Sequence, residues 1–276
     1  MAKFTVLGMG GFGLALAVML DNNGHSVNVW SAFESEIEDI KRDGENKKKL
    51  PGVKIKDSIT LTSDISTVSD SDVVIFGVPT GFVRSVAKQA APFITENTVI
   101  LNTSKGLEDK TFKRMSEVLH EELPNSPIVI LTGPSHAEEV GIGMPTTVVV
   151  ASDNSKYSDY IQSIMSNIAL RIYINDDVVG SELGGSLKNI IALCAGICDG
   201  MGFGDNTKAA LMTRGITEIA RLGVKMGGKR DTFAGLSGIG DLIVTCTSMH
   251  SRNRRAGILI GQGVSPDEAV KQIGTV

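Results

Sequence analysis

The sequence predicts an α/β protein in which a doubly wound sheet is followed by an all-helical domain. Short β-rich runs alternate with longer helical patterns in the first part of the chain, as expected of a parallel sheet with crossover helices. A glycine-rich loop joins the first of these strands to the first helix. After Asn175–Asp177 the patterns are helical and are punctuated by glycine. We therefore place the domain boundary near residue 178, with domains at residues 1–178 and 179–276.

The expected elements follow in chain order. Strands are expected at Phe4–Leu7, Val27–Trp30, Val73–Gly77, Val99–Asn102, Ile128–Leu131, Thr146–Ala151 and Arg171–Ile174. Helices are expected at about Gly11–Asn22, Glu34–Arg42, Phe82–Ala91, Thr111–Leu123 and Ser155–Met165. Lys47–Lys49, followed by Pro51 and Gly52, indicates a solvated loop. In the second domain only Leu242–Thr245 suggests a strand.

Composition narrows the possible partners. The formal charge is −4 and the pI is near 5.6, so nothing draws the whole chain to nucleic acid or to an anionic membrane. Phe4–Leu20 is uncharged and superficially resembles a signal peptide or a short membrane span, but its glycines favour a strand, a turn and a helix. Cys194, Cys198 and Cys246 are too few and too oddly numbered for a disulfide framework. Cys194 and Cys198 lie at helical i, i+4 spacing and could reach one metal, but we expect buried structural thiols. These observations favour a cytoplasmic protein without membrane insertion.

The loop Gly8-Met9-Gly10-Gly11-Phe12-Gly13 follows an expected strand and opens an expected helix, which is the context that a dinucleotide-binding loop requires. Gly8 permits the tight turn, Gly10 lets the backbone approach a pyrophosphate, and Gly13 lets the helix pack closely on the strand. The anion would lie on free N–H groups at the positive end of the helix. The loop therefore predicts a Rossmann-type domain that binds NAD or NADP.

The residues after the second strand do not decide between the two cofactors. An NAD site usually has an acidic residue there, which binds the ribose hydroxyls. Ser31 and Ala32 provide neither an acid nor an arginine for a 2′-phosphate. Glu34 is close, but it can equally be a first-turn charge that favours its own helix.

Two further loops follow strand ends, where open α/β sheets bind their ligands. Lys105 could approach a phosphate or polarise a carbonyl, or it could be a surface lysine. Gly133 ends the next strand and is followed closely by Ser135, which could bind an anion or cap the next helix. His136 could donate a proton or simply lie in a polar loop.

A helix that begins near Ser181 carries Lys188 on a face of small residues. At about 100° per residue, that face also holds Gly184, Gly185, Ala192, Ala195 and Asp199, whereas Leu183, Leu187, Ile190, Ile191 and Cys194 lie opposite. Small residues let a backbone or a ligand come close, and partial desolvation would lower the pKa of Lys188 toward the range useful for proton transfer. The alternative is a close helix crossing with Lys188 snorkelling outward.

Gly235–Asp241 is a glycine-dense loop that ends in a carboxylate, and Arg252, Arg254 and Arg255 follow it without an interleaved acid. Arginine suits bidentate phosphate recognition, although a solvated helix face is the alternative. No aromatic residues are interleaved to stack on bases. We therefore expect a small phosphorylated molecule as the partner, and no nucleic acid.

Several short motifs follow one another along the chain: the glycine loop, Val78-Pro79-Thr80, Ser104–Glu108, Gly133–Ala137, Leu183–Asn189, Gly235–Asp241 and His250–Arg255. Together they resemble bacterial NAD(P)-dependent glycerol-3-phosphate dehydrogenase over essentially the whole chain. The resemblance implies a Rossmann domain, a helical substrate domain, catalysis in the cleft between them, and a possible homodimer. The implied reaction interconverts dihydroxyacetone phosphate and sn-glycerol 3-phosphate with NAD(P)H, supplying glycerol 3-phosphate for phospholipid synthesis.

The loop and the resemblance also imply the site residues. The dinucleotide would be contacted by Gly8, Gly10, Gly11, Phe12, Gly13, Ala32, Lys105, Ala137, Arg252 and Val276. The substrate pocket would be lined by Lys105, Gly133, Ser135, Lys188, Asp241, Ser251, Arg252 and Asn253. Lys188 would exchange the proton at the C2 oxygen while the nicotinamide exchanges hydride at C2, and Asp241 would orient Lys188 or a substrate hydroxyl. Arg252 with Asn253 would grip the phosphate.

Two departures from the family pattern bear on these expectations. Related enzymes often carry a basic or imidazole side chain at Ser31-Ala32 for the 2′-phosphate, which Ala32 cannot replace. The sequence also stops at Val276, short of the usual family end, so we expect a helical domain that is incomplete relative to the family. A β-hydroxyacid or 6-phosphogluconate-type dehydrogenase is the alternative enzyme. A sensor of the NAD(P)H pool is the alternative from another class, disfavoured by the set of Lys105, Lys188 and Asp241.

Overall fold

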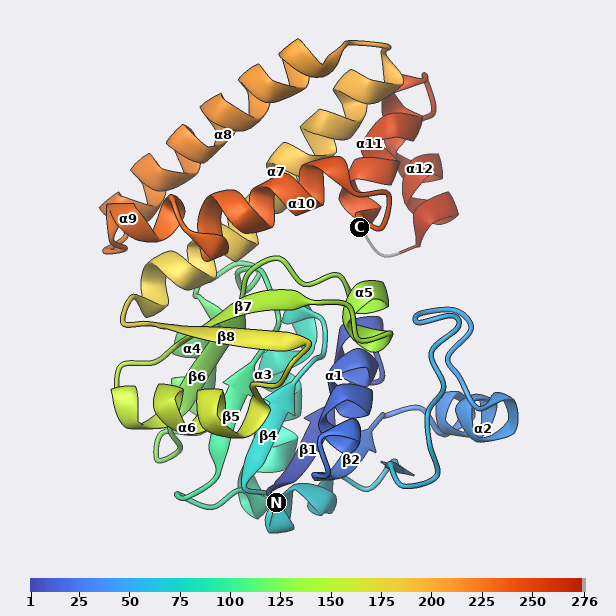
Figure 1. Cartoon of the computed structure of the whole chain (residues 1–276), viewed down its shortest axis with the longest axis vertical. Helices are drawn as coiled ribbons and strands as arrows, with labels where there is room; N and C mark the ends of the chain where they lie inside the picture. Colours follow the sequence, from blue (N-terminus) through green and yellow to red (C-terminus); the bar gives the residue numbers. More distant parts are fainter. Residues whose placement is uncertain (275–276) are drawn as a thin grey trace. The chain divides into compact units, whose positions relative to one another are not determined.

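The computed structural model describes residues 1–274. By its internal contacts the chain divides into two units. The first comprises residues 1–131 and 135–176, and the second comprises residues 132–134 and the chain from 177 onward. In Figure 1 the first unit holds all the strands, and the second holds the helices coloured from yellow to red.

The first unit is built on one eight-stranded sheet with the order β3-β2-β1-β4-β5-β6-β7-β8. The strands are β1 (Lys3–Leu7), β2 (Ser26–Trp30), β3 (Thr60–Thr62), β4 (Val73–Phe76), β5 (Val99–Asn102), β6 (Ile128–Thr132), β7 (Thr146–Ala151) and β8 (Leu170–Asn175). All seven expected strands are present. The additional strand, β3, is only three residues long and is not buried, so its sequence lacks the apolar run that marks the others.

The strand order reverses at β1, which pairs in parallel with both β2 and β4. Leu7, the last residue of β1, lies in register with Trp30 at the end of β2 and with Phe76 at the end of β4. The segments that follow these three strands therefore start side by side at the carboxyl edge of the sheet. This is the switch point at which open α/β sheets bind their ligands. The expected fold class, a doubly wound sheet followed by helices, is confirmed.

The helices of the first unit are α1 (Gly11–Asn22), α2 (Glu34–Asp43), α3 (Thr80–Ala90), α4 (Met115–Glu122), α5 (Ala137–Gly141) and α6 (Ser155–Met165), with short 3-10 turns η1 (Ile65–Asp70) and η2 (Ala91–Phe93). Helix α1 packs against α5, and α3 packs against α4. Helix α4 starts later than the expected Thr111, because the N–H of Arg114 is bonded by the Glu117 carboxylate and Arg114 acts as the N-cap.

The second unit contains α7 (Val178–Gly200), α8 (Asp205–Lys225), α9 (Arg230–Phe233), the π-helical turn η3 (Leu236–Gly240), α10 (Asp241–Thr247), α11 (Arg252–Gly261) and α12 (Pro266–Ile273). The expected strand at Leu242–Thr245 is wrong, because these residues belong to α10. Leu242, Thr245 and Cys246 are buried while Ile243 is exposed, which is the spacing of one helix face and not the alternation of a strand. The glycine-dense segment before it forms η3 rather than an irregular loop.

Helix α7 is the central element of the second unit and contacts α8, α10, α11 and η3. Its small-residue face admits neighbouring backbone: a Cβ added at Gly184 would collide with the carbonyl of Ser237 in η3, and one at Gly196 would collide with the carbonyl of Arg254 in α11. The expected close approach along this face is therefore an approach of backbone. Within residues 1–274 no helix is long and apolar enough to cross a membrane.

Candidate active site

The glycine loop forms an uncapped helix start at the carboxyl edge of the sheet. Gly8 has a φ of +113°, which favours glycine, and a Cβ there would lie 3.0 Å from Val78 Cγ1. A Cβ at Gly11 would lie 2.5 Å from the Lys49 carbonyl oxygen and 3.4 Å from the Ala137 side chain. No side chain caps α1 at Gly10, and its first turn has no acidic residue. This open, positive helix end fits the pyrophosphate of a dinucleotide.

An acid of α2, which the sequence analysis did not identify, is bonded to the residue that follows β2. Ala32 is exposed, whereas the buried Ser31 donates from its hydroxyl to Glu36 Oε2 at 2.8 Å. Glu34, the acid considered from the sequence, instead accepts a bond from Ser63 Oγ at 3.4 Å. Glu36 lies in the first turn of α2, and from the sequence alone it looks like an ordinary acidic residue of a helix start. The signal that could have identified it is its position roughly 20 residues after the glycine loop, where an acid that binds the ribose is expected.

Lys105 lies half-buried in a loop that follows β5 and is tied to the segment after β4. Ser104 Oγ donates to the Val78 carbonyl at 2.5 Å, and the Asn102 side chain bonds both the N–H and the carbonyl of Ser104. These bonds hold the backbone beside Lys105 at the carboxyl edge of the sheet. Lys105 therefore has a defined position in the first unit rather than that of a freely solvated surface lysine.

The segment after β6 begins with Gly133, whose φ is +107°. By its contacts Gly133 belongs to the second unit, whereas Ser135 and Ala137 belong to the first. The N-cap of α5 is His136, and its side chain makes no capping bond. Ala137 opens α5 and lies against Gly11, so two expected cofactor residues are brought together within the first unit.

Lys188, Asp241 and Thr245 form a buried polar cluster in the second unit. Lys188 is only 6% exposed, and its Nζ donates to Asp241 Oδ1 at 2.5 Å and to Thr245 Oγ1 at 2.7 Å. Thr245 Oγ1 in turn donates to the Asp241 carbonyl at 2.6 Å. The burial rules out the alternative in which Lys188 snorkels outward. Thr245 was missed because a strand was expected there, whereas helix α10 puts Asp241 and Thr245 one turn apart on the same face.

The run of arginines opens helix α11 and divides into different roles. Ser251 is buried and caps the helix, accepting from the N–H of Arg254 at 3.2 Å. Arg254 is bonded to Asp199 through Nε at 2.8 Å and to the Thr247 carbonyl at 2.7 Å, so it joins α11 to α7 and α10. Arg252 is exposed and Asn253 is half-buried in the first turn, which contains no acidic residue. This turn combines a helix start with an exposed guanidinium, as an anion site requires.

Three other expectations have simpler outcomes. Cys194 and Cys198 are only half-buried, so their expected burial was wrong, whereas Cys246 is buried. Within the described residues all three cysteines are free, and no group of three or more His, Cys, Asp or Glu residues is placed to hold a metal ion. Val276, expected to contact the cofactor, lies outside the described residues.

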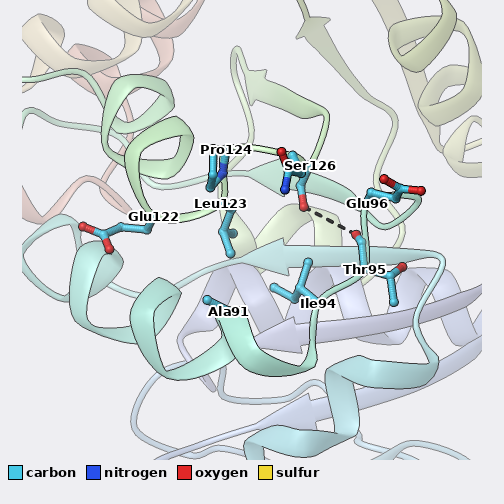
Figure 2. A pocket seen from close by; sticks show the side chains of 9 residues that line it. Ala91, Ile94, Thr95, Glu96, Glu122, Leu123, Pro124 and Ser126 are labelled. Carbon is cyan, nitrogen blue, oxygen red and sulfur yellow. Dashed lines mark hydrogen bonds between the residues drawn. The ribbon is translucent and has the colours of Figure 1, made fainter.

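A hollow in the first unit lies away from these residues. Figure 2 shows it between the segment that precedes β5 and the segment that precedes β6, where Ser126 Oγ donates to the Thr95 carbonyl at 3.5 Å. These segments are at the amino ends of the strands, opposite to the edge that carries the glycine loop and Lys105. We therefore assign it no part in the site, because ligands of open α/β sheets bind at the carboxyl edge.

A glycine loop at the switch point of a doubly wound sheet, followed by a helical unit with a buried lysine–carboxylate pair, is typical of the two-domain dinucleotide-dependent dehydrogenases. Sequence comparison identifies the particular family. Residues 3–158 match the N-terminal family model of NAD-dependent glycerol-3-phosphate dehydrogenase, and residues 177–276 match the C-terminal one. The chain therefore belongs to the NAD-dependent glycerol-3-phosphate dehydrogenase family, which confirms the resemblance inferred from its motifs.

Individual relatives agree with this assignment. The glycerol-3-phosphate dehydrogenase [NAD(P)+] of Fusobacterium nucleatum is 50% identical over 279 residues, covering 100% of this chain and 83% of the relative. That of Moorella thermoacetica is 53% identical over 275 residues, covering 99% of this chain and 82% of the relative. The crystal structure of glycerol-3-phosphate dehydrogenase from Coxiella burnetii superposes with a TM-score of 0.95 at 37% identity, covering 100% of this chain and 85% of that one.

Proposed function

We propose that this protein catalyses the NAD(P)H-dependent interconversion of dihydroxyacetone phosphate and sn-glycerol 3-phosphate, supplying the latter for phospholipid synthesis. The observation that carries the proposal is the buried bond between Lys188 and Asp241 in a chain of this family. Relatives that bear the name glycerol-3-phosphate dehydrogenase [NAD(P)+] over the full length of the chain support it.

Lys188 is the proposed proton donor to the C2 oxygen when the ketone is reduced, and the proton acceptor in the reverse direction. Its Nζ is fixed by two oxygen acceptors, Asp241 Oδ1 and Thr245 Oγ1, so the side chain loses little further freedom when substrate binds. Asp241 balances the lysine charge in this buried site, and Thr245 sets the orientation of both. Asp241 and Thr245 are thus proposed as positioning residues.

The dinucleotide is proposed to bind along the glycine loop. Gly8, Gly10, Gly11, Phe12 and Gly13 would hold the pyrophosphate and its neighbours at the start of α1, with Ala137 beside Gly11 and with Ala32, Lys105 and Arg252 as further contacts. When bound, the nicotinamide supplies or accepts hydride at C2. The contribution of the chain is an uncapped helix end and close backbone approach, which place the cofactor without a charged side chain in the loop.

The substrate phosphate is proposed to bind at the start of α11. Arg252 and Asn253 would donate to it, and Ser251 fixes the turn by capping the helix. Lys105, Gly133 and Ser135 are proposed to line the remainder of the substrate pocket, as the family motifs imply. The exposure of Arg252 and the helix start support the phosphate role, since Arg254 is already committed to Asp199.

The proposal extends to location and assembly. A cytoplasmic location is supported by the three free thiols of Cys194, Cys198 and Cys246. The expected homodimer stays a prediction, which sedimentation of the purified protein tests.

Product identification tests the proposed reaction. We expect oxidation of reduced cofactor with dihydroxyacetone phosphate and formation of sn-glycerol 3-phosphate. We expect no turnover of 3-oxo acids with reduced cofactor, and none of 6-phosphogluconate with oxidised cofactor. Turnover only with the acids would favour the β-hydroxyacid or 6-phosphogluconate-type alternative. Cofactor binding without turnover of any of these substrates would favour the sensor.

A further inference from the structure

Glu36 is the centre of a polar cluster that the proposed reaction does not use. Its carboxylate is 16% exposed, although it lies on a short surface helix. Oε2 accepts from Ser31 Oγ at 2.8 Å, and Oε1 accepts from Lys49 Nζ at 2.5 Å and from Asn46 Nδ2 at 3.4 Å. The residue that follows β2 and two residues of the loop after α2 are thus bonded to one carboxylate of α2.

This cluster adjoins the glycine loop. Asn46 Nδ2 also lies 3.4 Å from the Met9 carbonyl, within the loop itself. The Lys49 carbonyl occupies the space that a Cβ at Gly11 would need. Glu36 therefore faces the carboxyl end of β2 at the place where Rossmann domains bind the ribose of the adenosine half. Lys47–Lys49 are exposed, as expected of a solvated loop, and the backbone of this loop approaches the start of α1 at the Lys49 carbonyl.

We propose that Glu36 accepts a hydrogen bond from the 2′-hydroxyl of the adenosine ribose and makes this protein select NADH over NADPH. The inference rests on the proposed use of a dinucleotide. A carboxylate at this position bonds the ribose hydroxyls, whereas the 2′-phosphate of NADPH would bring a second negative group against it. Juxtaposed like charges are an efficient means of excluding the wrong ligand.

Lys49 also contributes to the proposed selection between the two cofactors. Its ammonium is the only cation bonded to Glu36 among the described residues, and its side chain is 49% exposed. While it is paired with Glu36, Lys49 holds the carboxylate in place. Removal of the Glu36 charge would release Lys49 toward a 2′-phosphate, which a compact ammonium binds well. Ala32 provides no cation of its own.

The first test measures the dissociation constants of NADH and NADPH by fluorescence titration of the protein. We expect the unaltered protein to bind NADH more tightly. Glu36→Gln keeps the size of the side chain and should shift the preference toward NADPH by roughly ten- to a hundred-fold, the range of a charge-assisted contact. Glu34→Gln is the matched control, because it removes a neighbouring charge of α2 that is bonded only to Ser63 in the described structure. It should leave the preference unchanged.

A second variant separates the roles of the two residues. Lys49→Met in the Glu36→Gln background should abolish most of the gain in NADPH affinity, because that gain depends on the released ammonium. Competition on the unaltered protein needs no substitution: 5′-ADP should displace NADH better than 2′,5′-ADP does.

The inference would be overturned if the unaltered protein bound NADPH more tightly than NADH. It would also be overturned if Glu36→Gln changed the ratio of the two affinities no more than Glu34→Gln does. Because these are binding measurements, they remain decisive if dihydroxyacetone phosphate proves not to be a substrate. A selective protein without that turnover would contradict the proposed function alone.

Discussion

Arg84 on α3 donates to both oxygens of the Glu108 carboxylate, through Nε at 2.6 Å and NH2 at 2.9 Å. Glu108 lies three residues after Lys105, in the same loop, and Thr111 Oγ1 donates to it at 2.5 Å. A second carboxylate, Glu122 on α4, accepts from NH1 of the same guanidinium at 2.5 Å. One arginine therefore fixes the far side of the Lys105 loop to two helices, in the planar geometry that only arginine provides.

We predict that Arg84→Leu lowers kcat/KM for dihydroxyacetone phosphate by up to about a hundred-fold, because a displaced Lys105 would misalign the substrate. Arg84→Lys should recover little, since lysine cannot form the two parallel bonds. Steady-state kinetics checks both. Lys88→Met is the control: Lys88 lies one turn further along α3 and meets Glu122 only at 3.8 Å. An equal loss of kcat/KM in that variant would mean that the positive charge on α3, and not the pair of bonds from Arg84 to Glu108, sustains the activity.

The paired bonds between Arg84 and Glu108 also predict that the stability of the protein depends on pH. The Arg84 guanidinium, and then the Thr111 hydroxyl, lower the pKa of Glu108 from 4.5 to about 2. A carboxyl group whose pKa is lower in the folded state stabilises it above the unfolded value and loses that contribution as the pH falls through the folded value. The stability difference between the unaltered protein and Glu108→Gln should thus be constant above about pH 5.5 and shrink between 4.5 and 2. Urea unfolding midpoints across this range give the measurement, and a difference independent of pH would contradict it.

Lys188→Ala should lower turnover by about two to four orders of magnitude while dinucleotide affinity changes only a few-fold, because the general acid proposed here acts on the substrate oxygen and not on the dinucleotide. The variant also removes one partner of the buried ion pair between Lys188 and Asp241, which costs about 3–5 kcal/mol of stability. Lys188→Met with Asp241→Asn removes both charges and should restore much of the melting temperature but none of the turnover. Recovery of more than a tenth of the parent rate in either variant would remove Lys188 from proton transfer.

Arg252→Leu should raise the KM for dihydroxyacetone phosphate by roughly ten- to a hundred-fold, with a much smaller effect on the phosphate-free ketone dihydroxyacetone. Comparison of the two substrates isolates the phosphate contact. Arg254→Leu offers the contrast, because that side chain holds Asp199 and should lower the melting temperature instead. If both substrates suffered equally in Arg252→Leu, the residue would serve the cofactor or the fold.

Cys246 should be the last of the three thiols to react with alkylating reagents. Burial raises the pKa of Cys246 to about 11, so little thiolate forms at neutral pH, and the side chain is inaccessible. Cys194 and Cys198 are half-buried and should be modified earlier. Mass spectrometry after timed iodoacetamide treatment gives the order, and treatment in denaturant, where all three should react at similar rates, gives the control.

The sequence alone predicted those features whose signals are local. The glycine loop, its strand and its helix are contiguous, and strands such as β4 and β6 are buried and largely apolar, so each could be located from its own residues. Lys188 could be found because its helix has one face of small residues. The family motifs supplied its partner, Asp241, which lies 53 residues further along the chain.

Features that depend on tertiary contact could not be predicted in the same way. The run of β-branched residues from Ile243 to Thr245 favours a strand, and only packing on α7 makes it helical, so Thr245 was missed. Glu36 reads as one of several helix charges until the loop carrying Asn46 and Lys49 folds back onto it. Arg84 and Glu108 are likewise joined only by the fold.

The contact of Gly184 with Ser237 has a consequence for anyone who wishes to redesign the enzyme. Ser237 lies in η3, and Asp241 begins the next helix directly after it, so the spacing between two main chains sets where the carboxylate stands relative to Lys188. No rotamer can absorb an added methyl group at residue 184, because the obstacle is a carbonyl oxygen. Substitutions that enlarge or shrink the substrate pocket are therefore best sought elsewhere, and residue 184 is the position to leave untouched in a mutant library.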